Sequence, residues 1–122
     1  MSERGGAVVN AASTACTIAS TGTGCRGAIK TRLPHLAEQL LGSLAPAPQV
    51  NAVALAVVRS TSDAALDEDR NQEMTRRYSL QRLGIATNGS GTLAFIPSDE
   101  DGWITSQTLF VDGGLTVGGG DL

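Results

Sequence analysis

One short segment has the spacing of a phosphate-binding loop. Residues 22–27, GTGCRG, match the pattern G-x-G-x-x-G that joins a strand to a helix in dinucleotide-binding proteins. Those glycines work when the strand leads directly into the turn, so that the helix N-terminus meets the pyrophosphate. Here the nearest strand-like run ends near residue 12, and no acidic residue closes a second strand at the expected distance. We therefore interpret the segment as a loop that enters a helix, with dinucleotide binding as the alternative.

The other reactive side chains form no obvious cluster. Cys16 and Cys25 are the only cysteines, and although a disulfide is conceivable, we interpret them as reduced thiols. His35 is the only histidine. Because we find no acid or nucleophile to partner it, we interpret His35 as an ordinary helix residue, and we identify no metal site.

The elements that would position these residues are predicted by apolar runs alternating with helical patterns. The strands are expected near 7–12, 50–58 and 107–112, and the helices at 24–44, at 61–78 and before Pro97. The run VNAVALAVV at 50–58 is almost continuously apolar, which favours a parallel strand covered on both faces. The alternation predicts an α/β fold with crossover connections, and 122 residues predict one domain over 1–122.

Composition excludes several classes of partner. The formal net charge is −3 and there is no basic stripe, so we expect no nucleic-acid binding. No apolar run approaches the roughly 20 residues of a membrane span. The N-terminus lacks the pattern of a signal peptide, and we therefore expect a cytoplasmic protein.

A series of landmarks is more specific than any of these patterns. In chain order they are VVNAAS at 8–13, GAIK at 27–30, VNAVA at 50–54, SDE at 98–100, GWIT at 102–105 and VDGG at 111–114. In this order and spacing, residues 5–118 resemble the C-terminal half of a short-chain dehydrogenase/reductase (SDR). The resemblance implies a truncated Rossmann-like three-layer fold, with about three parallel strands and their flanking helices.

The resemblance also implies catalytic positions. Family enzymes use a serine, a tyrosine and a lysine, and Ser13 and Lys30 fall on the serine and lysine positions. The tyrosine position is Arg26. The family tyrosine is a general acid or base, whereas a guanidinium keeps its proton, with a pKa above about 12. Arg26 could hold an anion but could not relay a proton, so Ser13 and Lys30 are expected to be remnants of the catalytic site.

Cofactor binding is expected to be weak for a related reason. Lys30 and Ser60 fall on cofactor-contact positions, but the family's Pro-Gly pair facing the nicotinamide is Leu55-Ala56 here. The glycine-rich phosphate turn and the ribose-reading residue of the family's first half have no counterpart. We therefore expect no cofactor on this chain alone, and NAD(P) only if a partner chain completes the site.

Three functions remain open from the sequence. The first is a non-catalytic pseudoenzyme that associates, with itself or with a full-length SDR, as an oligomerisation or regulatory partner. The strand near 7–12 would be an open sheet edge, which favours association, and we expect Trp103 to pack in the core or in an interface. The second is an active oxidoreductase subunit whose cofactor-binding half comes from another chain. The third is a decayed fragment without a dedicated function.

Overall fold

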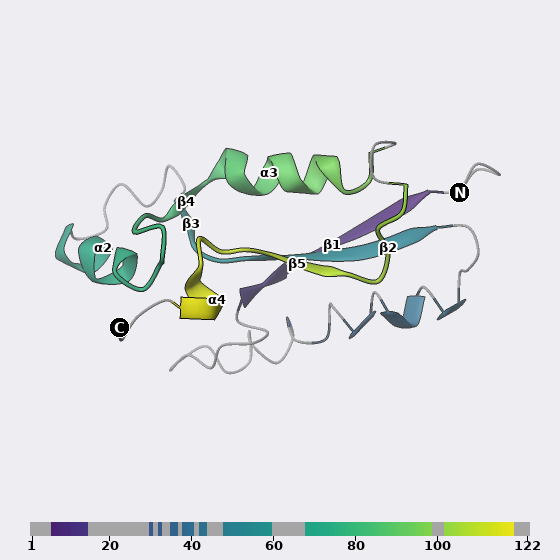
Figure 1. Ribbon diagram of the computed structural model, residues 1–122, viewed down its shortest axis with the longest axis horizontal. Coiled ribbons are helices and arrows are strands. Elements are labelled where there is room, and N and C mark those ends of the chain that lie inside the picture. The colour runs from purple at the N-terminus through teal and green to yellow at the C-terminus, as the bar shows by residue number, and fades with distance from the viewer. Residues whose placement is uncertain are drawn as a thin grey trace.

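The described part of the chain comprises residues 6–14, 30, 32, 35–36, 38–40, 42–43, 48–59, 68–98 and 102–118 of a computed structural model. Its elements are β1 (Ala7–Ser13), β2 (Gln49–Leu55), β3 (Val58–Arg59), α2 (Glu68–Thr75), β4 (Gly84–Ile85), α3 (Ala86–Phe95), β5 (Thr108–Val111) and α4 (Leu115–Gly118). Figure 1 shows α3 along one face of the sheet and the helical residues between Lys30 and Ser43 along the other. This arrangement is the three-layer α/β fold that the sequence predicts.

The main sheet has the strand order β1-β2-β5, and both strand pairs are parallel. The central strand is β2, whose residues Val50–Ala54 are all buried, as the continuous apolar run predicts. Within the described residues β1 is an edge strand, as we expected. The other edge is β5.

The predicted strand 50–58 is divided between two sheets. Its regular pairing in the main sheet ends at Leu55, and the amide of Ala56 still donates to the carbonyl of Val111 (3.3 Å). The chain then turns away, since the amide of Gly84 donates to the carbonyl of Val57 (3.1 Å) and β3 pairs in parallel with β4. The apolar pattern of the sequence does not predict this small sheet.

A buried asparagine joins β2 to the segment that leads into β5. The side chain of Asn51 is 1% exposed, its Nδ2 donates to the carbonyl of Ile104 (2.9 Å), and its Oδ1 accepts from the amide of Gln107 (3.0 Å). The amide of Val50 donates to Oγ1 of Thr105 (3.2 Å). These bonds satisfy a buried polar side chain and fix where β5 begins.

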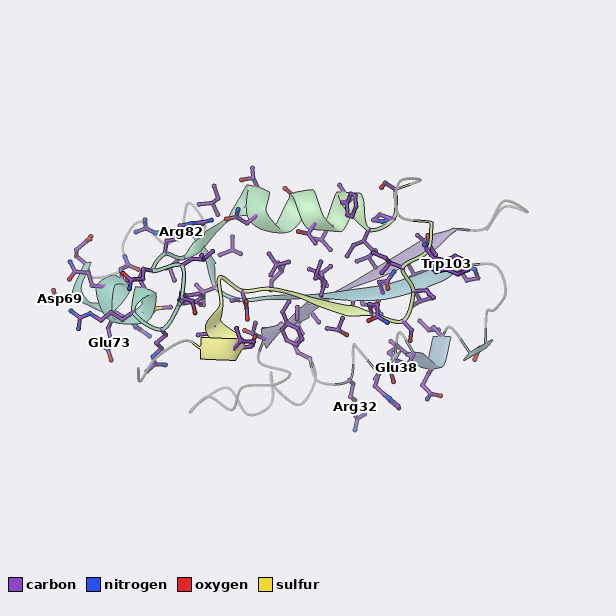
Figure 2. All side chains as sticks on the ribbon, in the orientation of Figure 1. Arg32, Glu38, Asp69, Glu73, Arg82 and Trp103 are labelled. Atoms are coloured by element: carbon purple, nitrogen blue, oxygen red, sulfur yellow. The ribbon has the colours of Figure 1, made fainter. Side chains whose placement is uncertain are left out.

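Several large apolar side chains lie on the surface. Trp103 is 97% exposed, so of its two expected settings, core or interface, the core is wrong. Figure 2 shows it at the end of the molecule opposite Asp69 and Glu73. An interface role for Trp103 stays a prediction. In the part of the chain that the structure describes, no helix has the length and apolar character needed to cross a membrane.

Candidate functional site

The carboxyl ends of the three parallel strands define the candidate site. Ser13 is level with Leu55 in the β1–β2 pair, and Leu55 is level with Val111 in the β2–β5 pair. In open α/β sheets, ligands bind outside the carboxyl ends of the strands. The sequence places its candidate serine at this edge, and the structure puts Ser13 at the last position of β1.

Lys30 reaches the same end of β1. Its Nζ donates to the carbonyl of Ala11 (3.2 Å), and Ala11 is two residues before Ser13. Ser13 is half-buried and takes part in an interaction of its own. The fold therefore brings Ser13 and Lys30 to one strand end. The predicted positions Arg26 and Ser60, like both cysteines, lie outside the described residues.

A pocket of about 490 Å³ opens at the carboxyl ends of β2 and β5. Most of its lining is apolar, from Leu55 and Ala56 to Phe110, and Arg82 and Asp112 are its charged side chains. Neither Ser13 nor Lys30 is among its lining residues. This pocket is thus lined by residues other than the predicted catalytic remnants.

Tyr78 is a pocket residue that sequence reasoning missed. The sequence predicts a helix at 61–78 that would include Tyr78, but α2 ends at Thr75 and Tyr78 is 4% exposed in the turn that follows. Its hydroxyl oxygen accepts a hydrogen bond from the amide of Val57 (3.3 Å). Burial raises the pKa of the Tyr78 phenol despite that hydrogen bond, so the group stays protonated at neutral pH. The available signal was a lone aromatic directly after a polar helix.

Asp112 anchors the turn between β5 and α4. Burial disfavours its charged form, but donors from Thr116 (Oγ1 and amide) and from the amide of Gly114 outweigh that effect and lower the Asp112 pKa. The carboxylate is thus ionised and its oxygens are engaged. It stabilises the turn and is poorly suited to accept a proton from a substrate.

The described residues do not by themselves fit a nicotinamide dinucleotide. Lys30 is the only predicted cofactor contact that the structure places at the strand ends. The only G-x-G-x-x-G segment in the sequence, residues 22–27, lies outside the described residues and does not directly follow β1, which ends at Ser13. A pyrophosphate needs the helix N-terminus that immediately follows such a strand. NAD(P) bound with the help of a partner chain stays a prediction for this site.

The three parallel strands have the order β1-β2-β5, and Ser13 and Lys30 lie at the carboxyl end of β1. This arrangement is a Rossmann-like architecture, and comparisons with known proteins agree with it. A family model described as enoyl-(acyl carrier protein) reductase matches residues 1–116. The chain is 32% identical over 114 residues to 3-oxoacyl-(acyl-carrier-protein) reductase FabG from Staphylococcus epidermidis, covering 93% of this chain and 47% of the relative. It is 31% identical over 119 residues to dehydrogenase/reductase SDR family member 4 from Caenorhabditis elegans, with coverages of 93% and 46%.

A solved structure shows the same likeness in three dimensions. A gluconate 5-dehydrogenase from Burkholderia cenocepacia, in complex with NADP and tartrate, superposes with a TM-score of 0.83 at 26% identity. The match covers 92% of this chain and 45% of the other. The chain belongs to the short-chain dehydrogenase/reductase family, and it spans about half the length of the curated relatives it matches.

Proposed function

We propose that this chain is a non-catalytic SDR-like protein that associates with a full-length NAD(P)-dependent oxidoreductase and stabilises or regulates it. The observation that carries the proposal is a series of exposed apolar side chains from the end of α3 to β5. They are Phe95, Trp103, Ile104, Leu109 and Phe110, with exposures between 36% and 97%. Large exposed apolar side chains gathered in one part of a chain are typical of protein–protein interfaces.

The residue types at the catalytic positions support the absence of catalysis in this proposal. Arg26 stands where the family tyrosine stands, and an arginine cannot exchange a proton near neutral pH. The Nζ of Lys30 donates to a backbone carbonyl of β1, which gives this lysine a structural contact. Association needs neither a proton relay nor a cofactor, so it is compatible with both observations.

The open edges of the sheet give association a physical reason. In the described residues, β1 and β5 each pair on one side only. Unpaired strand edges expose backbone donors and acceptors that another strand can satisfy. A second copy of this chain or a full-length relative could supply such a strand.

A second candidate is an active oxidoreductase subunit completed by another chain. It is favoured by the placement of Ser13 and Lys30 at the same end of β1. In that case the proton relay that Arg26 cannot provide would have to come from the partner. Residual turnover in a complex, abolished by Ser13→Ala or Lys30→Ala, would establish this candidate in place of the first.

The test is the native mass of the chain, by light scattering, after expression alone and with a full-length reductase of the family from the same source. We expect a discrete complex with the reductase, whose kinetics or thermal stability then change. Leu109→Asp should abolish the complex, because it places a charge among the apolar side chains near β5. Ile85→Asp, which alters a similarly exposed apolar residue in β4, is the matched control. A stable homodimer of this chain that does not bind the reductase would contradict the proposal.

A further inference from the structure

A second cavity lies between α2 and the small β3–β4 sheet. Its volume is about 560 Å³. It is lined by Arg59, Glu68, Asn71, Gln72, Thr75, Gln81, Arg82, Leu83 and Ile85. It shares only Arg82 with the pocket at the ends of β2 and β5. Figure 2 shows Arg82 and Trp103 toward opposite ends of the molecule. Leu109 and Phe110 of the proposed interface, however, line the same pocket as Arg82.

The face of α2 that lines the cavity is polar. Glu68, Asn71, Gln72 and Thr75 recur at the three- and four-residue spacing of a single helix face. A helix face that packs against a protein interior is normally apolar. Here this face presents a carboxylate, two amides and a hydroxyl, which are groups that hydrogen-bond to a polar ligand.

Asn71 is a buried polar side chain whose hydrogen bonding is incomplete. It is 7% exposed, and its Oδ1 has no hydrogen-bond partner. Buried amide oxygens are almost always paired, because leaving one unpaired is energetically costly. Asn71 also lines the cavity, so a bound molecule with a hydroxyl donor could supply the missing partner.

Two guanidinium groups give the lining its positive charge. Nη1 of Arg82 is held by the carbonyl of Leu83 and by Oδ1 of Asn88, both at 3.2 Å, which orients this side chain and leaves its other donors available. The side chain of Arg59 makes no hydrogen bond or ion pair with another described residue. Against the carboxylate of Glu68, the two arginine side chains leave one net positive charge among the described residues of the lining. Arginine is the side chain best suited to carboxylate and phosphate oxygens.

We propose that this cavity binds a small hydroxylated oxyanion, with Arg59 and Arg82 holding the carboxylate or phosphate group. The hydroxyls contact the polar face of α2, where Asn71 and Glu68 accept their hydrogen bonds. The acidic first turn of α2, Glu68 and Asp69, repels the anionic end of the ligand and so orients it toward the arginines. The proposal rests on the lining of this cavity and does not depend on the proposed association.

The test is backbone amide NMR of the full chain titrated to about 10 mM with three probes, a range that detects millimolar affinity. The probes are sn-glycerol 3-phosphate, D-glycerate and neutral glycerol. We expect one or both anionic probes to shift the amides of Arg59, Asn71 and Leu83, and glycerol to have no such effect. Which of the two anions binds identifies the preferred oxyanion.

Variants with opposite charge changes separate recognition from disturbed folding. Arg59→Gln should weaken binding about tenfold, through the loss of a charge-assisted bond. Glu68→Gln should tighten it about threefold, because it removes the carboxylate that repels the anion. Arg70→Gln removes one positive charge, as Arg59→Gln does, but from a position on α2 outside the cavity lining. It should leave the affinity within about twofold of that of the unaltered chain. The proposal is overturned if neither anion shifts these amides, if glycerol binds equally well, or if Arg59→Gln and Glu68→Gln leave the affinity unchanged.

Discussion

Tyr78 is buried although the helix that precedes it in the sequence is mostly polar. It follows a helix made almost entirely of polar residues, yet its ring is buried beside β2 and its hydroxyl accepts from the amide of Val57. It is also the only tyrosine of the chain. Any spectroscopic signal from a phenol therefore reports on this one position.

We expect Tyr78 to ionise above the ordinary tyrosine value of about 10, because burial raises its pKa. The Tyr78 phenol ionises near pH 10 in the unfolded chain and at a higher pH in the folded chain. Stability contributed by the neutral phenol is thus complete below about pH 10 and is lost as pH rises through the folded-state pKa. Phenolate absorbance in an alkaline titration measures this, with denatured chain as the control. If Tyr78 titrated in the folded chain at the same pH as in the denatured chain, this would contradict its buried position.

The positions of the candidate catalytic residues were easier to predict from the sequence than the burial of individual aromatic side chains. Ser13 and Lys30 were located by their spacing within the family's landmarks, and the structure puts both at one end of β1. Their chemical roles remain predictions. The burial of Tyr78 was missed, and the core alternative for Trp103 was wrong. A side chain's burial depends on where loops fold back, whereas sequence periodicity describes only regular elements.

At the scale of elements, the turn after β5 depends on two glycines in the left-handed region. Gly113 has φ of 58° and Gly114 has φ of 87°, and the amide of Leu80 donates to the carbonyl of Gly113 (3.0 Å). A Cβ on Gly114 would lie 2.5 Å from Oγ of Ser79. The turn and the segment after Tyr78 are therefore packed too closely for any side chain at this position.

We expect Gly114→Ala to destabilise the fold by about 2 kcal/mol, from backbone strain and the clash with Ser79. The urea midpoint of unfolding, followed by circular dichroism, measures the loss. Gly91→Ala is the matched control, since Gly91 is in α3 with open space around its Cβ position. That change should stabilise the chain by about 0.5–1 kcal/mol. Equal effects of the two changes would show that the turn tolerates a side chain.

The strands show where sequence prediction of elements stops. The apolar run at 50–58 correctly predicts a buried central strand, because burial on both faces selects continuous apolar residues. Its division at Ala56 and Val57 was not predictable, because it depends on pairing with Gly84, a residue distant in the sequence. The two-residue strands β3 and β4 are likewise defined only by their partner.

At the scale of the whole molecule, the surface is unusual for its exposed apolar groups. Trp103 is the only tryptophan, and it is 97% exposed in the turn before β5 (Figure 2). Exposed tryptophans are common where proteins meet, since one side chain covers a large apolar area. Its fluorescence therefore reports directly on the proposed association.

We expect the emission of Trp103 in the dilute chain to resemble that of indole in water. It should shift to shorter wavelength when the full-length reductase is added, because association removes water from the ring. Acrylamide quenching, strong before and weak after addition, checks the same change in exposure. An emission that is already blue-shifted at every dilution, or one that the reductase leaves unchanged, would contradict the assignment of Trp103 to this interface.

The parallel order of the strands also has a consequence for how the chain folds. None of the described strand pairs can form as a hairpin, and the bond between Gln107 and Asn51 joins residues separated by 56 positions. Proteins dominated by such distant contacts have high contact order and fold slowly. During that delay the apolar run that becomes β2 is without its neighbours and is prone to aggregate. The yield of native protein should therefore rise with slower synthesis, with chaperones, or with a partner that captures the chain as it emerges.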